Sequence, residues 1–190
     1  MLYKANHINI KIAEQAILDG NIIIYPTDTI YGFGVDATNS TAIKNLNKLK
    51  KRVQPYSIIV DSFEMLSKYA LTNHKINLKL NQIFPGPYTA ILNSKKSNLS
   101  QLVNCNMNTI GIRLPKSNFI NNLVKKINRP IITTSVNIHQ EKPINNLDDI
   151  QNKFSNLNIF YGEVNHESRG STIIDYTVSP FKIIRSGDSA

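Results

Sequence analysis

Apolar residues in the first half of the chain alternate between helical spacing and short β-rich runs. They recur at helical spacing over residues 8–17, and Asp19-Gly20 ends that helix. A run rich in isoleucine follows at 22–25 and stops at Pro26. The same pattern predicts strands over 56–60 and 88–92, and helices over 62–70, 73–84 and 40–51, the last capped by Ser40 or Thr41.

The second half of the chain is richer in strands. Period-two alternation over 109–114 places Thr109, Gly111 and Arg113 on one face of a strand. Further elements are predicted as helices over 119–127 and 147–154, strands over 130–134, 158–161, 171–175 and 181–184, and a polar loop over 137–146. Early alternation followed by clustered strands favours an α/β or α+β sheet with mixed strand directions, rather than a helical bundle or a β-sandwich.

Length and composition narrow the class of protein. The 190 residues fit one domain, and 41% hydrophobic residues exclude wholesale disorder. No apolar run approaches the length of a bilayer crossing, and the N-terminal segment shows no secretory signal. The single cysteine, Cys105, excludes an intramolecular disulfide and fits a reducing compartment, so we expect a cytoplasmic protein.

The charge of the chain favours anionic partners. Lys and Arg total 22 against 13 Asp and Glu, which gives a net charge of +9. This charge fits binding of nucleotides, RNA or phosphorylated metabolites, and equally fits simple solubility. Because the guanidinium fork binds phosphate and carboxylate in a way that lysine cannot, the few arginines are the first candidates for a site: Arg52, Arg113, Arg129, Arg169 and Arg185.

Several segments place polar groups where strands or helices end. Residues 26–34 combine hydroxyls, Asp28 and two glycines in a predicted turn, and residues 133–137 end a strand in hydroxyls and an amide. Residues 48–52 form either a phosphate clamp or an ordinary basic helix end. Each segment taken alone also fits a purely structural role.

Other chemistries find little support in the sequence. It contains no P-loop, no GxGxxG fingerprint and no GxSxG elbow. The four histidines have no metal-ligand spacing, and Cys105 has no local signature of a nucleophile. We therefore expect no protein-held metal site and no tightly bound cofactor.

Seven short motifs, in order along nearly the whole chain, resemble those of the threonylcarbamoyl-AMP synthase family, which has a YrdC-like fold. They are PTDTIYGFG (26–34), KKR (50–52), PGPYT (85–89), TIGIRLP (109–115), TTSVN (133–137), STIID (171–175) and RSG (185–187). The chain resembles the short members of that family. The resemblance implies a single YrdC-like domain over 1–190, an α/β (α+β) fold with a twisted mixed sheet, flanking helices and a basic concave cleft.

The resemblance implies an enzyme, an L-threonylcarbamoyladenylate synthase. Such a nucleotidyltransferase forms threonylcarbamoyl-AMP and pyrophosphate from L-threonine, bicarbonate and ATP with Mg²⁺, and partner proteins carry the group to tRNA. By motif, the threonine contacts are Thr29, Arg113, Thr133 and Ser171. The ATP contacts are Lys50, Arg52, Gln54, Thr109, Ser135, Asn137 and Arg185, of which Lys50 and Arg52 are the catalytic candidates.

One departure from the family pattern and two alternatives stay open at this point. Longer members have a histidine at a position that falls near Ile59 here. A non-catalytic RNA-binding module would also use a basic concave surface, although the aromatics do not interleave with the basic residues as a stacking platform requires. A carbamoyl-transfer domain that acts on a different acceptor would share the same motifs.

Overall fold

The computed structural model describes residues 1–188, which form six helices and eleven strands. The helices are α1 (Ile10–Leu18), α2 (Ser40–Lys50), α3 (Phe63–Tyr69), α4 (His74–Ile83), α5 (Asn118–Ile127) and α6 (Leu147–Lys153). The strands are β1 (Leu2–Lys4), β2 (Ile23–Tyr25), β3 (Gly32–Asp36), β4 (Ser57–Ile59), β5 (Ala70–Leu71), β6 (Tyr88–Ser94), β7 (Thr109–Arg113), β8 (Ile131–Ser135), β9 (Asn158–Tyr161), β10 (Thr172–Asp175) and β11 (Lys182–Arg185).

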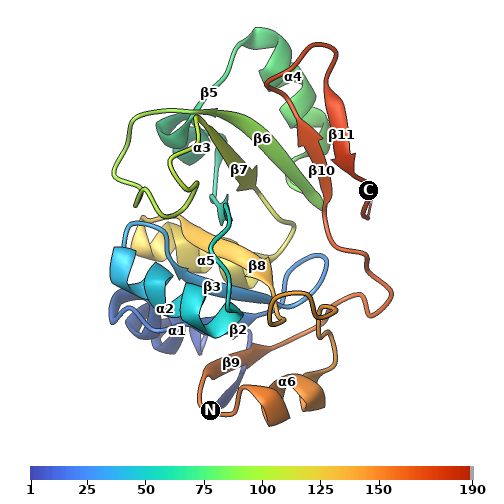
Figure 1. Cartoon of the computed structure of the whole chain (residues 1–190). Helices are drawn as coiled ribbons and strands as arrows, with labels where there is room; N and C mark the ends of the chain where they lie inside the picture. The colour runs from blue at the N-terminus through green and yellow to red at the C-terminus, as the bar shows by residue number, and fades with distance from the viewer. Residues whose placement is uncertain (189–190) are drawn as a thin grey trace.

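One continuous mixed sheet connects the molecule from end to end. Its strand order is β1-β9-β2-β3-β8-β4-β7-β6-β10-β11, with β5 added beside β6. The pairs β1–β9, β2–β9, β4–β7 and β6–β10 are parallel, and the others are antiparallel. Figure 1 shows β2, β3, β8 and β9 with α1, α2, α5 and α6 in the lower part, and β6, β7, β10 and β11 with α3 and α4 in the upper part. This architecture confirms the predicted mixed α/β fold.

Most predicted elements are present, with boundaries shifted by a few residues. The N-cap of α2 is Asn39, whose side chain accepts from the N–H groups of Thr41 and Ala42, so the prediction of Ser40 or Thr41 as the cap was wrong. The short edge strand β1 and the two-residue strand β5 were not predicted at all. Such short strands carry no periodic pattern, and pairing with β9 and β6 creates them.

The largest difference concerns β3, which was predicted to be part of a turn. All five of its residues are buried, and it pairs antiparallel with both β2 and β8. Gly34 is required by packing, because a Cβ there would lie 2.6 Å from Cε1 of Tyr25 and 3.0 Å from Cγ2 of Ile131. This glycine therefore marks close approach of side chains inside the sheet rather than a reversal of the chain.

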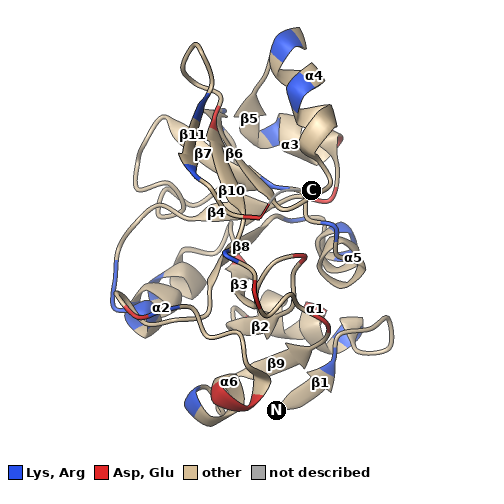
Figure 2. Ribbon diagram, turned by 90° about the vertical axis from the view of Figure 1, so that its right-hand side faces the viewer, with Lys and Arg blue, Asp and Glu red and all other residues tan. Residues whose placement is uncertain are grey.

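Isoleucine-rich strands and the inner faces of two helices form the core. Helix α1 contributes Ile10, Ala13 and Ile17, and it packs against α5, which buries five of its ten residues. No helix among the described residues combines the length and apolar character needed to span a bilayer. In Figure 2 the basic residues are spread over both parts of the molecule, including α2, α4 and α5.

Replacing Gly34 by alanine will lower the free energy of unfolding by about 2–3 kcal/mol, because the new methyl group overlaps the ring of Tyr25. Gly32→Ala on the same strand is the matched control, since its nearest neighbour would lie at 3.3 Å. Urea unfolding of the two variants and the wild type provides the comparison. Equal losses in both variants would contradict the proposed packing constraint.

Candidate functional site

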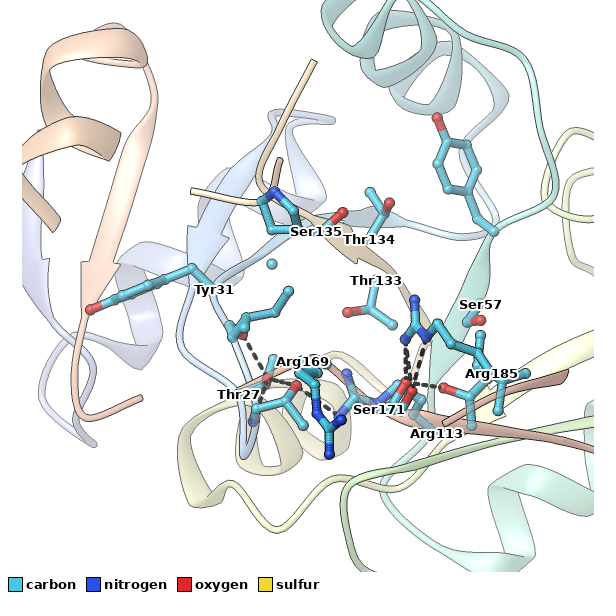
Figure 3. A pocket seen from close by; sticks show the side chains of 18 of the residues that line it. Thr27, Tyr31, Ser57, Arg113, Thr133, Thr134, Ser135, Arg169, Ser171 and Arg185 are labelled. Carbon is cyan, nitrogen blue, oxygen red and sulfur yellow. Dashed lines mark hydrogen bonds between the residues drawn. The ribbon is translucent and has the colours of Figure 1, made fainter. Parts of the chain in front are cut away.

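A cavity of about 230 Å³ lies where several strand ends meet. Its walls come from the β2–β3 loop, the starts of β3 and β4, the ends of β7 and β8, and the segment that leads into β10. Figure 3 shows side chains from these distant parts of the chain pointing toward the same space. The lining is rich in hydroxyl and guanidinium groups, so it suits a polar, anionic ligand.

The structure brings most of the predicted site residues together in this cavity. Those that line it are Thr29, Arg52, Arg113, Thr133, Ser135, Ser171 and Arg185. Those that do not line it are Lys50, Gln54, Thr109 and Asn137. Convergence of the first set shows that the separate motifs share one site, while the ligand assigned to each residue stays a prediction.

Four of the five arginines line the cavity: Arg52, Arg113, Arg169 and Arg185. The fifth, Arg129, donates instead to Asp36 at 2.8 Å. Burial, and secondly the nearby guanidinium of Arg113, lower the pKa of Arg185, although an arginine remains charged at any physiological pH. Several fixed positive charges around one small space favour a ligand with more than one negative charge.

Arg113 is held by a buried ion pair at the end of β7. Its Nη2 donates to Asp28 Oδ1 at 2.7 Å, and each of the two side chains is only 8% exposed. The second oxygen of Asp28 accepts from the backbone N–H of Lys116 at 2.8 Å. Arg113 Nε is buried and has no hydrogen-bond acceptor among the described residues. Arg113 also lines the cavity, so the part of its guanidinium that Asp28 does not hold suits an incoming carboxylate.

Hydroxyl groups gather on both sides of Arg113. Thr27 Oγ1 lies 3.0 Å from Thr29 Oγ1 and donates to the carbonyl of Ile30 at 2.7 Å. On the opposite wall, the hydroxyls of Ser171 and Thr89 are 2.7 Å apart, and Arg185 Nη2 donates to the carbonyl of Ser171 at 2.7 Å. These contacts fix the hydroxyls in place around the space that a small polar ligand would occupy.

Arg52 forms another wall of the cavity, and neighbouring side chains hold its guanidinium in place. It donates to Gln54 Oε1 at 2.9 Å and to Thr134 Oγ1 at 3.2 Å, and its guanidinium lies 5.5 Å from the ring centre of Tyr56. Gln54 therefore contacts Arg52 rather than the cavity. Arg52 Nε is a second buried donor with no hydrogen-bond partner among residues 1–188.

Three other predicted residues do not line the cavity: Lys50, Asn137 and Thr109. Lys50 is 1% exposed, and its ammonium donates to acceptors of Ser135 and Asn137. Thr109 begins β7, four residues or roughly 13 Å from Arg113 along an extended strand. The direct ATP contacts predicted for these residues are therefore not preformed in this structure and stay predictions.

The sequence analysis assigned no role to several lining residues, notably Tyr31, Tyr56, Ser57 and Thr89. Tyr31 and Thr89 lie within recognised motifs, and Tyr56 and Ser57 follow the KKR motif by a few residues, so proximity to a motif was the only available signal. Arg169 was a candidate only as one of the few arginines, and no ligand was assigned to it. Ile59, near the position of the family histidine, is fully buried in β4 and does not line the cavity. The residue that β4 contributes to the wall is Ser57.

No cluster of three or more His, Cys, Asp or Glu side chains suited to a metal ion occurs within the described part of the chain. The lining itself consists of hydroxyl, guanidinium, aromatic and apolar groups. A magnesium ion that accompanies ATP would have to be bound mainly through phosphate oxygens.

Comparison with known families identifies the protein's relatives. The profile of the Sua5/YciO/YrdC family, described as telomere recombination, matches residues 15–187. The chain belongs to this family. The match spans every motif that lines the cavity and confirms the resemblance found in the sequence.

Solved structures of related proteins share the YrdC-like fold. P. abyssi Sua5, solved in complex with L-threonine, is 25% identical with a TM-score of 0.90, covering 98% of this chain and 57% of that one. E. coli YciO is 20% identical with a TM-score of 0.88, covering 100% and 97%. HypF, solved in a phosphate- and nucleotide-bound form, is 19% identical with a TM-score of 0.84, covering 94% and 29%. This family member thus spans only a little over half the length of P. abyssi Sua5.

Lys50 makes the stability of this family member depend on pH. Burial, and secondly the charge of Arg52, lower the pKa of Lys50 from 10.5 to about 7. Between these values the unfolded chain binds more protons than the folded one, so the stability contributed by this residue rises with pH. The free energy of unfolding of the wild type minus that of Lys50→Met will therefore increase by on the order of 1 kcal/mol from pH 6.5 to 9.5.

Thermal unfolding across this pH range measures the effect. Lys44→Met, an exposed position on the same helix, is the control and should give a flat difference. A wild-type minus Lys50→Met difference that stays flat or falls with rising pH would contradict the lowered pKa.

Proposed function

We propose that this protein is an L-threonylcarbamoyladenylate synthase. It would form threonylcarbamoyl-AMP and pyrophosphate from L-threonine, bicarbonate and ATP. The observation that carries the proposal is a single cavity in which Arg113, with an unpaired buried Nε, lies among threonine and serine hydroxyls beside further arginines. Membership of the Sua5/YciO/YrdC family and the L-threonine bound to P. abyssi Sua5 support it.

The threonine end of the cavity centres on Arg113. Its free N–H groups would pair with the substrate carboxylate, while Asp28 holds the guanidinium in one orientation. Thr29, Thr133 and Ser171 would contact the amine and the hydroxyl of the substrate. All three are buried by the protein and line the cavity, so a ligand meets fixed partners rather than mobile ones.

The ATP end would use Arg52, Arg185 and Ser135, which line the same cavity. The arginines offset the charge of the triphosphate, and Mg²⁺ would neutralise further charge on its oxygens. Gln54 would act by orienting Arg52, whose guanidinium it contacts. Thr109 would have to reach the nucleotide from outside the cavity wall.

The chemistry requires anions to be brought together in line. The threonine amine attacks bicarbonate to give a carbamate and water. A carbamate oxygen then bonds to the α-phosphorus as the bond to the bridging oxygen breaks, and pyrophosphate leaves. Because no carboxylate or imidazole group lines the cavity among the described residues, positioning and charge stabilisation would supply most of the catalysis.

We further propose that the product is passed to partner proteins for modification of tRNA in the cytoplasm. The net charge of +9 also suits direct contact with RNA. An RNA-binding module without catalysis is the second candidate. It would bind RNA but show no threonine-dependent reaction of ATP.

Replacing Arg113 by alanine will lower threonine-dependent pyrophosphate release by at least about tenfold, or roughly 1.4 kcal/mol, because the carboxylate loses its charged partner. Release of pyrophosphate from ATP with bicarbonate and threonine measures this, with Lys44→Ala as an exposed charge control. A panel of amino acids in the same assay tests for a different acceptor. Wild-type rates in folded Arg113→Ala would contradict the assignment, and no release by the wild type would favour the RNA-binding module.

Arg169 is a further anion contact under this proposal. The other cavity arginines donate to protein acceptors, whereas the guanidinium of Arg169 makes no hydrogen bond or ion pair with another described residue. Its backbone N–H is held by Asp188 at 3.0 Å, so the side chain projects from an anchored position. A charged side chain with no internal partner is available to bind a phosphate group.

Arg169→Ala will weaken ATP binding by about three- to tenfold, since an Arg–phosphate hydrogen bond is lost. Titration of ATP into the variant measures the affinity. Lys44→Ala removes the same charge from an exposed site outside the cavity and should leave the affinity within about twofold of wild type. An equal loss of ATP affinity in both variants would show that Arg169 acts only through its general charge and would contradict a direct phosphate contact.

A further inference from the structure

Lys50 holds the end of β8 through both its side chain and its backbone. Its Nζ donates to the carbonyl oxygens of Ser135 and Asn137, at 2.7 and 2.9 Å, and to Asn137 Oδ1 at 2.8 Å. Its own carbonyl accepts from the N–H of His139 at 3.0 Å. Below the lowered pKa of about 7, Lys50 is an ammonium with three N–H groups and no acceptor, so these contacts leave it nothing to offer a ligand.

The same contacts fix the orientation of the Asn137 side-chain amide. Its oxygen faces the ammonium of Lys50, and its nitrogen donates to the carbonyl of Glu141 at 2.7 Å. A rotated amide would place NH₂ against the ammonium and oxygen against the carbonyl, and both contacts would be repulsive. The oxygen of Asn137 therefore points in one direction only.

This orientation determines which way the hydroxyl proton of Ser135 points. Ser135 Oγ lies 2.7 Å from Asn137 Oδ1, which can only accept, so Ser135 must donate. A hydroxyl has one proton, and this one is committed to Asn137. Toward the cavity, which Ser135 lines, the oxygen therefore presents only lone pairs.

We propose that Lys50 is a positioning residue that acts through Asn137 to make Ser135 a hydrogen-bond acceptor toward the ligand. Ser135 would then accept a hydrogen bond from the nucleoside part of a nucleotide, either from a ribose hydroxyl or from a base amino group. It would not bind a phosphate oxygen, because two hydrogen-bond acceptors repel each other. The inference rests on the proposed function only in that the ligand is a nucleotide.

Titration of AMP and of inorganic pyrophosphate into the full chain, at a pH below the lowered pKa of Lys50 so that the ammonium is present, separates this role from a direct phosphate contact. The variants are Lys50→Met, Ser135→Ala and the double variant, with Lys44→Met as the control on α2. Each single change should weaken AMP binding about five- to tenfold, since one hydrogen bond is lost. The double variant should be no weaker, and pyrophosphate affinity should stay within about twofold of wild type.

Two results would overturn the inference. If Lys50→Met weakens the binding of pyrophosphate as much as the binding of AMP, the ammonium contacts phosphate directly. If the losses multiply in the double variant, Lys50 does not act through Ser135. A wild-type chain that binds no AMP overturns it as well.

Asn137→Ala provides a test in which Lys50 is retained. It removes the acceptor that holds the Ser135 proton, so AMP affinity should fall about five- to tenfold, as in Ser135→Ala, while pyrophosphate affinity stays within about twofold of wild type. An unchanged AMP affinity would contradict the inference, even if Lys50→Met does not fold. AMP binding that follows the expected pattern, with no threonylcarbamoyl-AMP formed, would refute the proposed function and leave this inference standing.

Discussion

The antiparallel pairing of β8 with two neighbours is the constraint on which the site depends. Strand β8 aligns Ser135 with Gly32 of β3 and Thr133 with Ser57 of β4. The parallel pairing of β4 with β7 puts Gly111 opposite Ser57, so Arg113, two residues further along β7, lies on the same face of the sheet. Because the ladder fixes these partners, four segments distant in sequence deliver polar groups to one space.

Glycine and burial make this arrangement possible. Strand β3 is buried along its whole length and lies directly against Tyr25, so residues with a Cβ at Gly34 do not fit. A Cβ at Gly111 of β7 would lie 2.5 Å from the hydroxyl of Ser57, another lining residue. The glycines in the motifs therefore serve the packing of the sheet that supports the cavity.

The charge of the cavity is balanced only in part by the protein. Asp28 offsets Arg113, whereas Arg185 donates to a neutral carbonyl and Arg52 donates to neutral side-chain oxygens. Partly buried guanidiniums without carboxylates retain an unfavourable desolvation cost that an anionic ligand relieves. Lys50 differs from them, since its three acceptors satisfy it internally and make it part of the scaffold.

The sequence by itself determined the alternation of helices and strands, the family motifs and the importance of the few arginines, because these are local patterns of spacing and residue type. Only the tertiary structure decided that residues 32–34 form a strand, since pairing with β2 and β8 overrides the turn preference of glycine. It also decided that Arg169 lines the cavity and that Lys50 lies behind it. The position of Lys50 depends on contacts with Ser135 and Asn137, more than eighty residues away in the sequence. The position of Arg169 depends on the path of the loop that Asp188 holds. No local sequence pattern encodes either contact.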